Sequence, residues 1–297
     1  RGQDPLYFNE EAVKRGEKTQ PLLNLNDPHP DILGYGADFR YFQAHLPVRE
    51  QDEAVGHAVR LNYLFTGVAD LGLELGDREL ICVCNLIWQD ISSKKMYITG
   101  GIGQTRKNEG FMKEYFLPNH EAYAETCAAI SFAFLSHRLL QTVLNSKFSD
   151  TIELEMYNGI LAALSTKGDT IFYENPLALD ISKRKHHRED WFRCSCCPNN
   201  FTRFYAAIHQ YILSVSNDNK LIAIHQYISG KGTINLDPAN TSPNRTDSNS
   251  AEIEIDSGFP WNGNVGIKIS TKNVSDLKIA LRIPGWCSEF AIILNGK

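Results

Sequence analysis

Residues 52–70 read DEAVGHAVRLNYLFTGVAD, and apolar side chains recur along this stretch at the spacing of one face of an α-helix. The recurring positions are Ala54, Val55, Ala58, Leu61, Leu64 and Phe65. We expect Gly72 and Gly76 to end this helix. Further helical patterns follow at about residues 79–93, 123–144, 151–164 and 199–212. Helices of this length without intervening strands favour an α/α toroid or an α-solenoid.

The periodicity changes to that of strands at about residue 213. Strand-like segments, with turn residues between them, stand at 221–224, 251–255, 265–269 and 277–283, and apolar and polar residues alternate in the last three. We therefore expect a mainly α chain, in which helical residues 1–212 are followed by antiparallel strands in residues 213–297. Strands and helices do not alternate along the chain, which argues against a Rossmann sheet or a TIM barrel.

The composition points away from proteins that bind nucleic acid or membranes. The 297 residues carry a net charge of −5, and no apolar run approaches the ~20 residues of a membrane-spanning helix. The seven cysteines are clustered, which favours a metal site or a reducing compartment, here the cytoplasm, over a disulfide framework. The chain begins at Arg1 and ends in a turn signal at residues 294–297, so we interpret it as a fragment of a longer protein.

Residues 191–198 read WFRCSCCP and place three cysteines within four positions. A second short segment, ETC at residues 125–127, adds a carboxylate and a fourth thiol. Free cysteines are often no more than small buried apolar side chains. A disulfide between the adjacent Cys196 and Cys197 is disfavoured, because their Cα atoms are only about 3.8 Å apart. We therefore favour a metal site, with zinc as the first candidate.

Glu125 and Cys127 stand near the start of the expected helix 123–144. Residues two apart do not share a helix face, so both can bind one metal only if the backbone leaves the helical conformation there. The alternative is that Glu125 simply caps the helix N-terminus, where the helix dipole stabilises a carboxylate. The departure from the helix that metal binding requires should be visible in the structure.

Three further side chains stand where a ligand could reach them. Glu109 lies in the glycine-rich loop 97–118 between helices, which is a usual place for catalytic groups, although a loop glutamate can also be simply solvated. His57 has small and apolar neighbours, which also suits a hydrogen-bonded core imidazole. Tyr173 ends a short extended piece and could present its hydroxyl to a ligand or be buried. The residues alone leave these alternatives open.

Nine segments along the chain form a specific combination. They are PVRE at 47–50, GHAVR at 56–60, YITGGIG at 97–103, LPN at 117–119, ETCAA at 125–129, YNG at 157–159, FYENP at 172–176, WFRCSCCP at 191–198 and LRIPGW at 281–286. Together and in this order they resemble glycoside hydrolase family 127, the β-L-arabinofuranosidases, and the related family 146. The resemblance covers nearly the whole chain, and it implies a partial (α/α)6 barrel followed by a partial antiparallel β-sandwich domain.

The resemblance also implies the roles of individual residues. It implies a zinc ion held by one carboxylate and three thiolates, those of Glu125, Cys127, Cys196 and Cys197. Cys196 would be the nucleophile and Glu109 the general acid/base. His57, Tyr173 and Glu125 would contact the arabinofuranose.

These implied roles are chemically consistent. Cysteine attacks as its thiolate, and free cysteine is mostly protonated at pH 7, whereas bound zinc deprotonates a coordinating thiol. The thiolate would replace the second carboxylate of a retaining glycosidase, so that one free acid suffices. The implied reaction removes non-reducing-end β-L-arabinofuranose from an arabinose-containing oligosaccharide or glycoconjugate. The full-length protein would be a homodimer.

Two other classes of function remain open from the sequence. A noncatalytic carbohydrate-binding protein would use a structural zinc, which suits four protein ligands and no open position. Another (α/α)6 sugar enzyme, such as an unsaturated uronyl hydrolase or an epimerase, would not need the thiols. The family proteins are much longer than this chain, and the resemblance implies that their additional N-terminal part closes the barrel and supplies further sugar-binding histidines.

Overall fold

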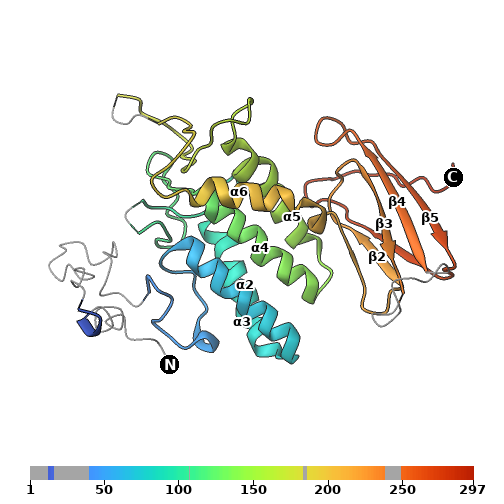
Figure 1. The fold of residues 1–297 in the computed structure, drawn as a ribbon, viewed down its shortest axis with the longest axis horizontal. Helices are drawn as coiled ribbons and strands as arrows, with labels where there is room; N and C mark the ends of the chain where they lie inside the picture. Colours follow the sequence, from blue (N-terminus) through green and yellow to red (C-terminus); the bar gives the residue numbers. More distant parts are fainter. Residues whose placement is uncertain (1–12, 17–39, 107, 183–185, 238–248) are drawn as a thin grey trace. The chain divides into compact units, whose positions relative to one another are not determined.

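The computed structural model describes residues 13–16, 40–106, 108–182, 186–237 and 249–297. The chain divides into two compact units, Arg1–Phe204 and Tyr205–Lys297. Figure 1 shows helices in the first unit and strands in the second. No helix among the described residues combines the length and the apolar character that crossing a membrane would require.

Helices build the first unit. They are η1 (Val48–Glu50), α2 (Ala58–Leu75), α3 (Arg78–Asp90), η2 (Ile91–Lys95), α4 (Thr126–Thr142), α5 (Ser146–Leu154), η3 (Glu155–Ile160), η4 (Leu161–Ala163) and α6 (Cys196–Ala206), of which η2 and η3 are π-helical. α4 packs against α2, α3 and α5, and these helices lie side by side in Figure 1. α4 is the central helix because small and apolar side chains are buried around most of its circumference, among them Ala128, Ala129, Phe132, Leu135 and Leu139.

The first predicted helix, residues 52–70, is shifted along the chain and spans Ala58–Leu75 in the structure. Residues before Ala58 do not join it, because Gly56 has a φ of 71° that a right-handed helix does not allow. A side chain on Gly56 would also overlap the carbonyl oxygen of Arg40. The close packing of the Gly56 backbone against Arg40 therefore determines where α2 begins, and the spacing of apolar residues in the sequence does not reveal this contact.

The prediction that Gly72 ends the first helix is wrong. α2 continues through Gly72, and its missing side chain lets α3 approach closely, because a Cβ there would lie 2.7 Å from Ile81 Cδ1. Gly76 ends the helix instead, with a φ of 65° in the left-handed region that favours glycine. Asp77 then caps α3 by accepting hydrogen bonds from two backbone N–H groups of its first turn.

The other predicted helices each overlap an observed element, with different ends. The predicted helix 151–164 begins earlier, at Ser146, because the Asn145 side chain accepts a hydrogen bond from Lys147 N and caps α5. It then loosens into the π-helical turn η3 and the 3₁₀ turn η4. The predicted helix 199–212 begins at the cysteines, as α6, and ends in the separate 3₁₀ turn η5 (Ile208–Tyr211).

The second unit holds two three-stranded sheets. The first contains β1 (Leu213–Val215), β2 (Leu221–Ile224) and β6 (Lys278–Leu281), and the second contains β3 (Gly230–Asn235), β4 (Ser250–Ser257) and β5 (Val265–Lys272). Buried side chains of both sheets, with Leu236 just after β3, form one apolar cluster: Ile222, Ile224, Leu236, Ala251, Ile253 and Ile255. β2 and β6 pair in parallel, so the expectation of purely antiparallel strands is wrong for this pair.

η3 contains a buried carboxyl group. Glu155 is fully buried, and neither of its carboxyl oxygens has a hydrogen-bond partner within the described part of the chain. Two glycines make room for it: a Cβ on Gly159 would collide with Glu155 Oε2, and a Cβ on Gly100 would lie 3.2 Å from that oxygen. Burial raises the pKa of Glu155 well above its ordinary value, so the folded chain keeps this proton to a higher pH than the unfolded chain.

Glu155→Gln is expected to flatten the pH dependence of stability. The unfolded state loses the Glu155 proton above a pKa of about 4.3 while the folded state retains it, so the free energy of unfolding falls by up to about 1.4 kcal/mol per pH unit up to the raised folded pKa. Urea titrations between about pH 5 and pH 8 measure this slope. The exposed Glu74→Gln on α2 is the control, and an unchanged slope in E155Q would contradict the prediction.

Candidate active site

The two cysteine-bearing segments meet at the starts of two helices. Cys127 is in the first turn of α4, and Cys196 and Cys197 open α6. Cys127 Sγ lies 3.4 Å from Cys197 Sγ, although the two residues are 70 apart in the chain. Cys197 Sγ lies 3.9 Å from Cys196 Sγ. Both separations exceed the ~2.05 Å of a disulfide bond, and all seven cysteines of the chain are free.

Glu125 stands just outside α4. Its backbone is extended, with φ −62° and ψ 136°, and the helix begins at the next residue, Thr126. The predicted start at residue 123 is therefore wrong, because Ala124 has a φ of 39° that no right-handed helix contains. The Glu125 side chain makes no capping hydrogen bond to the helix, so the simple capping role is also excluded.

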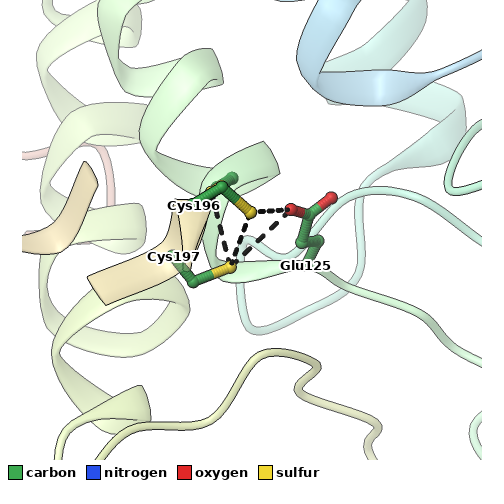
Figure 2. A group of neighbouring side chains, drawn as sticks. Glu125, Cys196 and Cys197 are labelled. Atoms are coloured by element: carbon green, nitrogen blue, oxygen red, sulfur yellow. Dashed lines mark hydrogen bonds between the residues drawn. The ribbon is translucent and has the colours of Figure 1, made fainter. Parts of the chain in front are cut away.

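This departure from helical geometry turns Glu125 towards the thiols. Glu125 Oε1 lies 3.5 Å from Cys196 Sγ and 3.6 Å from Cys197 Sγ, as Figure 2 shows. Glu125, Cys127 and Cys197 are nearly or fully buried, and Cys196 is half-buried. A carboxylate and three thiols thus share one small volume with little access to water.

The four side chains fit a tetrahedral zinc site. Their ligand atoms all lie within 4.8 Å of one another. Around a zinc ion with Zn–S bonds of about 2.3 Å and Zn–O bonds of about 2.1 Å, sulfur atoms would be about 3.8 Å apart and sulfur and oxygen about 3.6 Å apart. Cys197 Sγ lies 3.4 Å from Cys127 Sγ and 3.9 Å from Cys196 Sγ, and Glu125 Oε1 lies 3.5 and 3.6 Å from the sulfur atoms of Cys196 and Cys197. The donor set and its spacing therefore suit this ion.

Burial and mutual hydrogen bonds distribute the protons in this cluster. Hydrogen bonds with the thiols of Cys127 and Cys197 and with the hydroxyl of Tyr173 hold the pKa of Cys196 well below its usual range. Burial raises the pKa of Cys197. Burial and the neighbouring Cys196 charge raise the pKa of Glu125. Cys196 is therefore the thiol in this cluster that most readily becomes a thiolate, the form in which cysteine attacks.

Tyr173 approaches Cys196 from an extended segment. Thr126 N donates a hydrogen bond of 2.9 Å to Tyr173 O, and an antiparallel β-bridge pairs the neighbouring Glu125 with Glu174. The chain before α4 thereby holds the extended segment in place. Tyr173 Oη lies 3.0 Å from Cys196 Sγ, so the hydroxyl contacts the sulfur.

Glu109 and His57 form a pair beside this cluster. His57 Nε2 lies 2.9 Å from Glu109 Oε2. A close backbone approach brings them together: Phe111 N donates to Gly56 O, and a Cβ on Gly110 would overlap that carbonyl oxygen. Glu109 itself has a φ of 50°, a strained conformation of the kind that concentrates at functional sites.

Glu125 belongs to both groups. The ligand atoms of His57, Glu109 and Glu125 also lie within 4.8 Å of one another. The imidazole and carboxylate pair therefore lies next to the thiol cluster, with Glu125 between them. The site therefore brings together a carboxyl group (Glu109), a thiol that ionises readily (Cys196) and a hydroxyl (Tyr173). A double-displacement reaction at a sugar carbon would use these groups.

Comparison with known proteins decides the family. Residues 8–210 match the family model described as "Beta-L-arabinofuranosidase, GH127 catalytic domain", and residues 222–297 match the GH127 middle domain. The chain belongs to glycoside hydrolase family 127.

Characterised and solved relatives agree with this family 127 assignment. The chain is 36% identical to a non-reducing end β-L-arabinofuranosidase of Bifidobacterium longum, over all of this chain and 44% of the relative. A family 127 β-L-arabinofuranosidase from Geobacillus stearothermophilus T6 superposes with a TM-score of 0.81 at 35% identity, over 97% of this chain and 43% of that one. A second family 127 β-arabinofuranosidase superposes with a TM-score of 0.75 at 41% identity, over 83% of this chain and 36% of that one. The chain thus spans less than half the length of these relatives.

The structure of this family 127 chain brings together every residue that the sequence singled out for the site. The thiol cluster and the glutamate and histidine pair meet at Glu125, and Tyr173 contacts Cys196. Cys194 lies in the same sequence motif but is exposed. Its side chain also hydrogen-bonds to Cys196 and helps to lower the pKa of that thiol. Replacement by serine, which keeps a hydrogen-bond donor there, is therefore the matched control for experiments on the other two.

Sequence reasoning missed a polar chain behind the cluster. Asn200 Nδ2 donates a hydrogen bond of 3.0 Å to Cys127 Sγ, and Tyr63 Oη donates to Asn200 Oδ1 at 3.1 Å. Arg203 in turn donates to Tyr63 Oη at 2.9 Å. Asn200 stands four residues after Cys196 on α6, so helical spacing from the cysteine motif was the signal that could have found it.

Asn200→Ala is expected to weaken metal binding by about 10- to 100-fold, because partners of the ligands orient them and tune their charge. Competition with a chromophoric chelator on the full chain measures the affinity. Asn199→Ala, one residue earlier on α6 and exposed, is the matched control. Equal zinc affinity in N200A and N199A would show that the hydrogen bond to Cys127 does not support the site.

Proposed function

We propose that the protein is a retaining glycoside hydrolase that removes non-reducing-end β-L-arabinofuranose from arabinose-containing oligosaccharides or glycoconjugates. The observation that carries the proposal is the convergence of Cys196 with a tyrosine hydroxyl, a carboxylate and two further thiols, beside the Glu109–His57 pair. The names of the relatives supply the sugar. The catalytic part would be residues 1–212, followed by β domain material in residues 213–297.

We propose zinc as the cofactor of this site. The ligands would be the buried Glu125, Cys127, Cys196 and Cys197. When bound, the ion would keep the coordinating thiols deprotonated and balance the negative charge that burial otherwise disfavours. The Asn200 amide would hold the Cys127 sulfur in position from behind.

Cys196 and Glu109 would divide the reaction between them. In the first step the Cys196 sulfur attacks the anomeric carbon, a C–S bond forms, and the glycosidic C–O bond breaks as Glu109 gives its proton to the leaving oxygen. In the second step Glu109 takes a proton from water, whose oxygen attacks the same carbon and releases the thiolate. Two inversions at one carbon retain its configuration.

The neighbouring side chains would orient these two groups. His57, through its Nε2, would hold the Glu109 carboxyl and also contact the sugar. The Tyr173 hydroxyl would support the Cys196 sulfur before attack and reach the sugar hydroxyls afterwards. Glu125 would also contact the sugar, through the carboxyl oxygen that the cysteines do not use.

The noncatalytic alternative keeps one supporting observation, which is that four protein donors complete a tetrahedral site. Covalent trapping separates the two functions. The full chain is incubated with an arabinofuranose-based electrophile and digested for mass spectrometry. We expect one label, on Cys196, with none on the exposed Cys194. A chain that binds zinc at this site but labels at no cysteine would overturn the hydrolase proposal and support the structural role.

A further inference from the structure

The two oxygens of Glu125 differ in their surroundings. Glu125 Oε1 faces Cys196 and Cys197, whereas Oε2 is buried and has no hydrogen-bond partner among the residues that the structure describes. Figure 2 shows this second oxygen pointing away from the two cysteines. The side chain is only 2% exposed, and an unsatisfied buried carboxylate oxygen is destabilising unless something binds it.

The groups on the free side of Glu125 are metal ligands by type. His57 Nε2 and Glu109 Oε2 are 2.9 Å apart, and ligand atoms of both residues lie within 4.8 Å of a Glu125 ligand atom. Imidazole nitrogen and carboxylate oxygen are both zinc ligands, and catalytic zinc sites combine three protein ligands with one position open to water. This set is separate from the thiols and shares only Glu125 with them.

We propose that His57, Glu109 and Glu125 form a second divalent-cation site, bridged to the thiol site by the Glu125 carboxylate, and that its occupation inhibits hydrolysis. Each oxygen of Glu125 would then serve one ion. The inhibitory part of this inference rests on the proposed function, because it requires Glu109 to be the acid/base.

Occupation would block Glu109 directly. A cation bound by the Glu109 carboxylate takes the lone pair that must accept the proton, so Glu109 can neither protonate the leaving oxygen nor deprotonate water. The same ion would occupy the His57 nitrogen that contacts Glu109. Inhibition should therefore follow the concentration of free zinc in excess of the first equivalent.

The second site should be weaker than the first. It offers one nitrogen and two oxygens, whereas the thiol site offers three sulfur atoms, which zinc and cadmium prefer. Binding also breaks the His57–Glu109 contact of 2.9 Å. The two ions would therefore bind in order, and the chain would be active with one equivalent and inhibited with two.

Cadmium and zinc titrations of the full chain test the second site. With ¹¹³Cd²⁺, NMR should show a thiolate-type resonance at one equivalent and a separate resonance of nitrogen and oxygen type at the second. Calorimetry with Zn²⁺ should show two classes of site. In Glu109→Gln the second class should weaken by more than the roughly 10- to 100-fold that loss of an outer-shell partner costs, because a direct ligand is replaced, while the first is retained. Glu114→Gln, an exposed carboxylate of the same loop, should retain both.

The outcomes separate this inference from the proposed function. The second site is overturned if the chain binds only one equivalent of metal, or if E109Q and E114Q bind the second equivalent equally well. Either result counts even if the chain hydrolyses arabinofuranosides. Two equivalents without inhibition of hydrolysis overturn the inhibitory role. Failure of the proposed function shows instead as no hydrolysis and no label on Cys196 in the chain with one zinc, while the titration still reports the second site.

Discussion

Cys196→Ser is expected to lower kcat/KM for an aryl β-L-arabinofuranoside by at least about 10⁴-fold, which is the scale of nucleophile removal in other covalent catalysts. Serine places a hydroxyl where the sulfur stands, close to Tyr173 Oη and Glu125 Oε1. A hydroxyl is far less acidic than a thiol whose pKa its neighbours hold low. The variant therefore lacks a nucleophile in the ionised form that attack requires.

The matched control for this variant is Cys194→Ser. Cys194 belongs to the same motif but is exposed, and serine keeps a donor for the hydrogen bond that Cys194 makes to Cys196. Its replacement should therefore leave kcat/KM close to that of the natural chain. Because Cys196 is also a proposed metal ligand, the zinc content of each variant is measured beside its activity. Turnover by C196S like that of C194S would remove Cys196 as nucleophile. Lost activity with retained zinc would place the defect at the attacking atom.

The membership of the site was more predictable than its geometry. The cysteine motif and the resemblance together named Glu125, Cys127, Cys196 and Cys197, and the structure gathers them. Local spacing could not show this convergence, because it says nothing about which helix ends meet across 70 residues. The two-residue spacing of Glu125 and Cys127 did show that the backbone must leave the helix at Glu125 if both side chains bind one metal. The structure has the extended backbone that this requires.

Contacts made by the backbone were the least predictable part of the site. Glu109 lies beside His57 because two glycines allow their chains to touch, with Phe111 N donating to Gly56 O. A glycine-rich loop in the sequence indicates such freedom but not the segment that it approaches. The buried Glu155 is a similar case, because a glutamate in a helical pattern reads as exposed until a π-helical turn and nearby glycines enclose it.

The strands were also only partly predictable from the sequence. β4 and β5 alternate apolar and polar residues, whereas β2 is a short apolar run, and the sequence predicts these three strands and β6. β3 (Gly230–Asn235) was missed because its side chains are mostly exposed and two glycines interrupt the pattern. Its existence depends on antiparallel pairing with β4 rather than on its own side chains. The parallel pairing of β2 with β6 likewise depends on a distant segment, so the sheet order is not readable from local alternation.

Glu109→Gln is expected to lower kcat by about 10²- to 10⁴-fold for substrates with poor leaving groups, because no proton reaches the departing oxygen. Glutamine has the size of glutamate and can still accept a hydrogen bond from His57 Nε2, so the pair that holds the residue at a φ of 50° should persist. For an aryl substrate with an acidic leaving group, the first step needs little protonation. The loss should then shift to the second step, and the glycosyl-enzyme on Cys196 should accumulate.

This dependence on the leaving group separates an acid/base from a residue that only shapes the site. A structural defect would lower turnover by a similar factor for every aryl group, whereas loss of the acid should steepen the dependence of kcat/KM on leaving-group pKa. Azide, which attacks without losing a proton, should restore release of the sugar from E109Q and give the β-azide, since retention requires two inversions. E114Q, in the same loop and exposed, should show neither effect. A uniform loss without azide rescue would exclude Glu109 as the acid/base while leaving the nucleophile untouched.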